Sequence, residues 1–207
     1  MPTYTEIQSN IATTLSRSDL TSSIQEAIKR AVRFYERDLF WFNLAEDSFI
    51  GSSTAKRVWT ISATNTLFSI EQVVVNYNSS RYELGPENSE VIRAADATNL
   101  NGLPSKWAFD PIQRAIVFDT NLNVTATVSY TYVKKMTTLS AAGDSHEFTN
   151  NASDLIEARA CWWLYLTKIK NKPAADAMKE VELGELSSLI SETNSKVGSG
   201  RVTPTKF

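Results

Sequence analysis

The chain has 207 residues, of which 42% are hydrophobic and 10% aromatic, so it can form a packed core and is not a disordered chain. Its net charge of −2 at pH 7 argues against a strongly basic nucleic-acid binder. No apolar run reaches the length of a membrane span, and residues 1–10 lack the features of a signal peptide. We therefore expect a chain made in the cytoplasm that has no membrane partner.

A short amphipathic helix is expected over residues 4–16. Thr3 and Glu6 have the spacing of a capping box, and Ile7 and Ile11 recur on one helical face. Most of the other positions are Ser, Thr, Asn or Gln, which are weak helix formers in this setting. This helix therefore needs to pack against the one that follows it.

The segment Arg17–Asn43 predicts a longer amphipathic helix that ends in an aromatic cluster. Its start is bracketed between Ser18 and Ser22, and Ser22 with Gln25 fits a capping box. Four consecutive large apolar residues, 39–42, cannot all face one side of a helix, so some must contact another element or another subunit. The apolar residues at helical spacing are Leu20, Ile24, Ala27, Ile28, Ala31, Phe34, Tyr35 and Phe42.

From Lys56 to Val133 the sequence alternates as half-buried strands do. Residues 90–97 are expected to form one short helical turn within this region. We predict an antiparallel sheet or small sandwich of five or six strands. The expected strands lie near residues 58–60, 73–77, 82–84, 107–109, 115–118 and 125–133.

Two further helices are predicted after a polar connector at residues 137–151. The third helix begins at Ser153 or Asp154 and runs to Lys170, and the fourth follows Pro173 to about Ser195. The apolar stripe of the fourth helix shifts phase near its glycine, which indicates a bend or a change of packing partner. Its members are Ala174, Ala177, Met178 and Val181, then Leu186, Leu189 and Ile190.

This order of elements predicts an α+β fold built on a four-helix bundle of two N-terminal and two C-terminal helices, with an inserted antiparallel β-region and an extended C-terminal tail. The expected boundaries are 1–50 and 137–195 for the two parts of the bundle, 51–136 for the β-region and 196–207 for the flexible tail. The second helix should pack on the third. The residues expected in the core or at an interface are Ile28, Phe34, Tyr35, Phe40, Trp41, Phe42, Trp162, Trp163 and Tyr165.

The sequence predicts no catalytic, cofactor-binding or metal-binding residues. His146, the only histidine, is expected in a solvated loop, because its neighbours Asp144 and Ser145 cannot converge as a catalytic triad does. One His and one Cys do not complete a usual zinc site. Cys161 is expected to be a buried, inert thiol.

Two other charged groups could carry a function. The carboxylate pairs Glu46-Asp47 and Glu87-Glu90 have the residue types that a glycosidase needs, although such pairs are common by chance. The basic residues of the second helix, Lys29, Arg30, Arg33 and Arg37, could contact DNA phosphates. We favour a solvated face paired with Glu26 and Glu36 at helical spacing.

The string AIKRAVRFYERDLFWFN at residues 27–43 resembles a segment near the N-terminus of head-to-tail adaptor proteins of short-tailed bacteriophages. In that family an amphipathic helix with an Ala-Ile pair runs into an Arg-x-x-aromatic-Trp-aromatic-Asn ending. The matching residues of the ending are Arg37, Phe40, Trp41, Phe42 and Asn43. The order of helices, β-region, helices and tail is similar to the family as well.

The resemblance implies a structural virion protein, assembled in the host cytoplasm, that forms a ring of usually twelve copies at the head-tail junction. Such a ring docks under the portal protein, extends the DNA channel and attaches a downstream tail protein, which is a nozzle or a tail fibre or spike. Double-stranded DNA passes without sequence specificity. The resemblance also implies portal docking through the C-terminal extension, here with Lys196, Arg201, Val202, Lys206 and Phe207.

Two alternatives belong to other functional classes. One is a soluble, β-rich carbohydrate- or ligand-binding module with helical flanks, in which exposed Trp and Tyr side chains stack on sugars. The other is a hydrolase that uses a carboxylate pair. The mass of the protein in solution and beside a portal ring distinguishes both from an adaptor.

Overall fold

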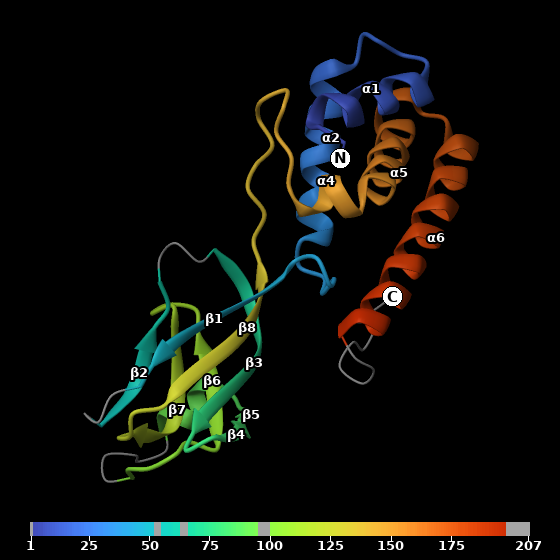
Figure 1. The fold of residues 1–207 in the computed structure, drawn as a ribbon. Coiled ribbons are helices and arrows are strands. Elements are labelled where there is room, and N and C mark those ends of the chain that lie inside the picture. The colour runs from blue at the N-terminus through green and yellow to red at the C-terminus, as the bar shows by residue number, and fades with distance from the viewer. Residues whose placement is uncertain (1, 52–54, 63–65, 95–99, 198–207) are drawn as a thin grey trace. The chain divides into compact units, whose positions relative to one another are not determined.

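The computed structural model describes residues 2–51, 55–62, 66–94 and 100–197. The chain divides into two compact units (Figure 1). Met1–Asn43 and Lys135–Phe207 form a helical unit, and Leu44–Lys134 form a sheet unit. Each unit has its own apolar core.

Two helices, α1 (Tyr4–Leu15) and α2 (Thr21–Tyr35), begin the helical unit. The predicted capping box of α1 is confirmed: Thr3 N donates to Glu6 Oε2 at 2.7 Å, and Glu6 N donates to Thr3 Oγ1 at 3.3 Å. The capping box predicted at Ser22 is wrong, because α2 has Leu20 at its N-cap.

The chain re-enters this unit through α4 (Glu147–Asn151), α5 (Ser153–Leu164), a π-helical segment η1 (Tyr165–Ile169) and α6 (Lys172–Val197). The predicted packing of the second helix on the third is confirmed, since α2 packs on α5. Helix α6 packs on α5 as well, so that α5 lies between α2 and α6 (Figure 1). Their contact buries the side chains of Ile28, Leu155, Ile156 and Leu164 completely.

Helix α6 confirms the predicted stripe at Met178, Leu186, Leu189 and Ile190, which lie in or against the core, and contradicts it at Ala177 and Val181. Its buried residues are Ala175, Glu182, Leu189 and Thr193, whereas Ala177 and Val181 are exposed. Ala175, Glu182 and Leu189 follow one another at intervals of seven residues, which keeps them on one continuous face toward α5. No phase shift is needed once the buried face is allowed to contain an acidic residue.

The sheet unit contains two four-stranded sheets. The first sheet has the order β1 (Leu44–Ile50), β8 (Thr127–Lys134), β3 (Leu67–Tyr77) and β4 (Ser80–Glu83), with antiparallel neighbours throughout. The second sheet has the order β2 (Lys56–Thr60), β7 (Ala115–Leu122), β6 (Lys106–Asp110) and β5 (Gly85–Pro86). Strand β5 is parallel to β6.

Alternating residues of both sheets pack into one apolar cluster, which is the pattern of a sandwich. Val73, Val75 and Val128 come from the first sheet, and Ile116 and Phe118 from the second. Helix α3 (Ser89–Ala94) adds a small satellite cluster with the second sheet.

The predicted fold class, a four-helix bundle with an inserted β-region, is wrong. The described residues form six helices and two four-stranded sheets. The two sheets enclose an apolar core of their own, so they are not a small insertion in a helical bundle. The prediction failed because α4 is a single helical turn in a polar connector, which leaves no periodic pattern. Strands β1 and β5 were also missed, since β1 directly follows the aromatic segment and β5 has two residues.

Candidate interaction surfaces

The aromatic segment at residues 40–43 forms a closed turn after α2. Asn43 holds it from inside: Phe40 N donates to Asn43 Oδ1 at 2.9 Å, and Asn43 Nδ2 donates to the Asp38 carbonyl at 2.7 Å. The Phe40 and Phe42 rings stack at 5.3 Å between centroids, and the Phe148 ring packs edge-on against both. The turn therefore fixes the end of α2 in the core.

Trp41 points the other way, toward the C-terminal end of α6. Its backbone N–H donates to Thr193 Oγ1 at 3.3 Å, and Lys196 Nζ lies 3.4 Å from its ring centroid. Lys196 also forms an ion pair with Glu192 at 2.6 Å. A hydrogen bond and a cation–π contact thus join the last turn of α6 to the segment that follows α2.

Glu182 of α6 is a buried carboxylate that contacts three polar side chains. The Tyr35 hydroxyl of α2 and the Arg159 guanidinium of α5 donate to Oε1, the latter at 2.9 Å. Oε2 lies 3.1 Å from Lys179 Nζ in an ion pair but accepts no hydrogen bond from the described residues. Burial and the bond to Glu182 raise the pKa of Tyr35, which keeps its hydroxyl protonated as a donor.

Arg159 lies between two aromatic rings at the surface of the helical unit. Its Cζ is 3.8 Å from the Phe34 ring centroid and 4.5 Å from that of Trp162. Lys179 Nζ lies 5.5 Å from the Trp162 centroid. Phe34 is 53% exposed, so it lies outside the buried core as a large aromatic held in place by a cation.

The other residues expected in the core or at an interface fall into two groups. Buried side chains are those of Ile28, Tyr35, Phe40 and Phe42. Half-buried side chains, which line the edge of the same core, are those of Trp41, Trp163 and Tyr165, together with Trp162.

The sequence matches the model of a known family. A family model described as SU10 adaptor protein matches residues 2–204. The chain belongs to the SU10 adaptor protein family. The match confirms the predicted relationship to phage head-to-tail adaptors, and the family implies a structural, non-enzymatic component of the phage particle. Comparison with the curated proteins finds no match.

The predicted docking residues of this adaptor lie mostly beyond the part of the chain that the structure describes. Arg201, Val202, Lys206 and Phe207 are outside the described residues. Lys196 is inside, and its ammonium is already engaged by Trp41 and Glu192. Lys196 is therefore held in the last turn of α6 by contacts within the chain.

The prediction for His146 is wrong. Instead of lying in a solvated loop, His146 is buried and is the N-cap of α4, where its Nδ1 accepts from Thr149 N at 3.3 Å. Its Nε2 is buried and has no hydrogen-bond partner among the described residues. Burial lowers the pKa of His146 below its ordinary value of 6.5, so the ring stays neutral.

The other candidates for chemistry have structural partners in this adaptor. Cys161 is buried as predicted, and burial raises its pKa to about 12, which makes the thiol unreactive. Asp144 accepts the backbone N–H groups of Ser140 and Ala141, both at 2.7 Å. The described residues contain no group of three or more His, Cys, Asp or Glu side chains placed to bind a metal.

In each carboxylate pair of the adaptor, one member has a structural partner. Glu87 forms an ion pair with Lys106 at 2.9 Å, which lowers the pKa of this carboxyl. Asp47 accepts the Tyr130 hydroxyl at 2.9 Å and packs against the sandwich side of β1, whereas the adjacent Glu46 is on the opposite face. A carboxylate pair that acts on one bond needs both groups on the same side.

Glu26 and Glu36 behave differently toward the basic face of α2. The pairing of Glu26 is confirmed, since it forms an ion pair with Arg30 at 2.8 Å. The pairing predicted for Glu36 is wrong, because Glu36 is buried and accepts the Met136 backbone N–H at 3.3 Å.

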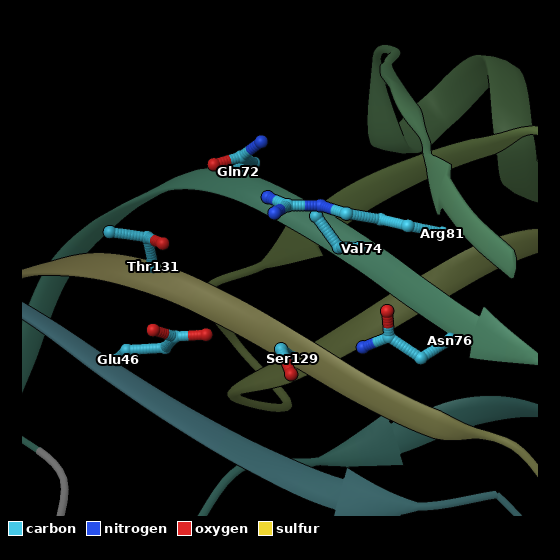
Figure 2. A pocket seen from close by; sticks show the side chains of 7 residues that line it. All are labelled: Glu46, Gln72, Val74, Asn76, Arg81, Ser129 and Thr131. Carbon is cyan, nitrogen blue, oxygen red and sulfur yellow. The ribbon is translucent and has the colours of Figure 1, made fainter. Parts of the chain in front are cut away.

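A polar cavity of about 200 Å³ lies on the outer face of the first sheet (Figure 2). Figure 2 shows Arg81 reaching from β4 across Val74 toward Gln72. The lining residues are Glu46, Gln72, Val74, Asn76, Arg81, Ser129 and Thr131. Since this lining has no aromatic side chain, it lacks the stacking surface that a carbohydrate site generally needs.

Among the described helices of the adaptor, none is long and apolar enough to cross a bilayer.

Proposed function

We propose that this adaptor forms a homo-oligomeric ring, of twelve copies as the family resemblance implies, beneath the portal at the head-tail junction. The ring extends the DNA channel and provides the attachment site for a nozzle or a tail fibre or spike. The observation that carries the proposal is the family match, which covers residues 2–204 and therefore both units. The interactions of Trp41 and Lys196 support it, because they fasten the helix that leads into the tail.

The tail has the composition of a segment that binds an acidic, partly apolar partner. Residues 197–207 contain two basic residues, Arg201 and Lys206, and no acidic residue, and they also contain Val202 and Phe207. A single tail would bind weakly, because a segment that orders on docking loses conformational entropy. A ring engages many tails at once, so effective concentration strengthens the whole contact. We therefore assign portal docking to this segment, with Phe207 and Val202 as apolar anchors.

Passage of double-stranded DNA fits the charge of the chain. A channel wall must let DNA slide, and a tight electrostatic contact would oppose sliding. The formal net charge of −2 is compatible with a conduit that contacts DNA without sequence specificity.

Deletion of residues 201–207 tests the docking role. The shortened chain keeps every described residue, so we expect it to remain folded with an unchanged melting temperature. We also expect it to lose co-sedimentation with the portal ring of the same phage. A shortened protein that joins portal with unchanged affinity would show that the docking surface is elsewhere. Failure of the full-length chain to join portal would contradict the proposed function itself.

A further inference from the structure

The polar cavity of Figure 2 lies within the sheet unit, on the outer face of β1, β8, β3 and β4. Its floor is Val74, which is 5% exposed. Strand pairing places three of the lining residues in one row, since Glu46 is opposite Thr131 and Thr131 is opposite Gln72. The row therefore crosses three neighbouring strands and has a carboxylate at its β1 end.

Arg81 brings the opposite charge to the other end of this row. Its backbone lies on β4 opposite Asn76, which is four residues along β3 from Gln72. Figure 2 shows its side chain reaching across Val74 toward Gln72, so the guanidinium comes to the β3 end of the row. The cavity thus has a cation on one side, a carboxylate on the other, and hydroxyl and amide groups between them.

The polar side chains around the cavity are not used by the fold. None of them forms a side-chain hydrogen bond or ion pair with another described residue. They are Glu46, Gln72, Asn76, Arg81, Ser129 and Thr131. Both donors and acceptors therefore converge on one cavity with their hydrogen-bonding capacity free for a ligand.

Arg81 differs in this respect from the other arginines of the sheet unit. Arg57 donates to the Phe118 carbonyl at 2.7 Å, and Arg93 pairs with a buried aspartate. Arg114 interacts with another residue as well. Opposite charges on a solvated sheet face generally pair across neighbouring strands. The strand β8 instead separates Glu46 from the end of the row that Arg81 reaches.

Size and spacing favour a short extended peptide as the ligand. The cavity volume of about 200 Å³ is below the roughly 300–1,000 Å³ of sites for larger ligands, so it takes side chains and not a folded domain. Strands β1 and β3 are two strand spacings apart, which is about 10 Å. An extended peptide places alternate side chains on one face about 7 Å apart. The lengths of a lysine and a glutamate side chain cover the difference.

Other ligand classes fit the charges of the cavity less well. A divalent cation would meet a single carboxylate, Glu46, and would be repelled by the guanidinium of Arg81. Duplex DNA would bring its phosphates against Glu46, with only one cation to attract them. Residues 197–207 of the chain itself contain no acidic side chain for Arg81.

We propose that this cavity binds an extended segment of a partner protein that presents one acidic and one basic side chain at positions i and i+2. The acidic side chain accepts from the guanidinium of Arg81, and the basic side chain donates to Glu46. Gln72 and Thr131 hydrogen-bond the peptide groups between them. The cavity lies within the sheet unit, so its occupancy depends neither on ring formation nor on portal docking.

Short synthetic peptides test the site on the full-length chain. The probe is acetyl-Thr-Lys-Thr-Glu-Thr-amide, and the matched controls carry two lysines or two glutamates at the charged positions. Binding is followed by NMR titration of the backbone amide signals of β1, β3, β4 and β8. We expect the mixed-charge probe to shift the signals of the lining residues. It should bind at least about tenfold more tightly than either control, because like charges that face each other across an interface repel.

Charge reversal should switch which peptide binds. Arg81→Glu gives the cavity two carboxylates, so the two-lysine peptide should become the preferred ligand. Glu46→Arg gives it two guanidinium groups, so the two-glutamate peptide should be preferred. Both positions are exposed, and each variant should keep the parent melting temperature. Glu90→Arg is the matched control, because Glu90 is exposed on α3, which packs on the second sheet. It should bind the three peptides as the parent does.

The outcomes are distinct from those that test the proposed ring. A switch of preference in both variants supports the site. Equal affinity for all three peptides, or no shift of the lining signals at millimolar peptide, overturns the proposal. Free lysine and glutamate that together bind as tightly as the probe would also overturn it, because the cavity would then hold small solutes instead of a peptide. Preserved peptide binding in a chain that forms no ring and joins no portal would contradict the proposed function alone.

Discussion

At the scale of single residues, Glu182 does the most to define how the helical unit packs. It joins α2, α5 and α6 through Tyr35, Arg159 and Lys179, although a buried carboxylate is costly to remove from water. The buried ion pair of Glu182 with Arg159 therefore determines which helix faces meet, and it adds little net stability. Removal of its charge leaves the guanidinium of Arg159, whose side chain is 16% exposed, without its counter-ion.

Glu182→Gln should therefore lower the free energy of unfolding by roughly 3–5 kcal/mol, the usual effect of breaking a buried ion pair. Glu180→Gln, two residues earlier and exposed, is the matched control and should stay within about 0.5 kcal/mol of the parent. Urea denaturation measures both. Equal effects of the two changes would show that Glu182 is not a buried counter-ion.

His146 gives the stability of the protein a specific dependence on pH. In the unfolded chain it binds a proton near its ordinary pKa of 6.5, whereas burial lowers its pKa in the folded state. The unfolded state therefore gains a proton first as pH falls, and stability is lost below about pH 6.5 until the folded pKa is reached. Each unit of pKa difference is worth about 1.4 kcal/mol.

His146→Asn should flatten this loss between about pH 7 and pH 5, because asparagine caps a helix without titrating. Melting temperatures across that range, for parent and variant, provide the measurement. Parallel pH profiles for the two proteins would mean that the His146 ring reaches solvent and titrates normally.

At the scale of elements, the turn at residues 38–43 explains why the motif has an asparagine. Asn43 satisfies a buried backbone N–H and a carbonyl that would otherwise lack partners, and three Phe rings close over the turn. We expect Asn43→Ala to cost about 1–3 kcal/mol, the penalty for leaving a buried polar group unpaired. Asn151→Ala, which removes one hydrogen bond at an exposed position, should cost less. A smaller loss for Asn43→Ala than for Asn151→Ala, by denaturation midpoint, would contradict this role of Asn43.

Periodicity predicted the elements whose buried faces are apolar and failed where polar residues are buried. Thr3 and Glu6 marked the start of α1, and the stripe of α2 gave its packing on α5. The face of α6 was partly misassigned because Glu182 and Thr193 are polar in sequence but accept hydrogen bonds from Tyr35 and Trp41, which lie in distant segments. His146 was misassigned because it is buried as the N-cap of α4, although its hydrogen-bond partner Thr149 is local. Such burial depends on the folded context and leaves no local pattern.

At the scale of the whole molecule, recognition of the motif at residues 27–43 supplied what composition could not. The family match over residues 2–204 confirms the adaptor relationship. The number of strands in the two sheets was underestimated, since short strands such as β5 have too few residues to show alternation. The sequence could not show that α5 lies between α2 and α6, because this order of helices appears only in the fold.

Electron cryomicroscopy of the intact phage particle tests whether this chain is the ring between head and tail. The proposed function predicts a closed ring of identical copies directly beneath the portal, with residues 201–207 of each copy in contact with it. The sheet unit and the helical unit of the same chain should both fit that ring density. Absence of the chain from the junction, or its presence there as isolated copies that touch neither each other nor the portal, would contradict the proposal.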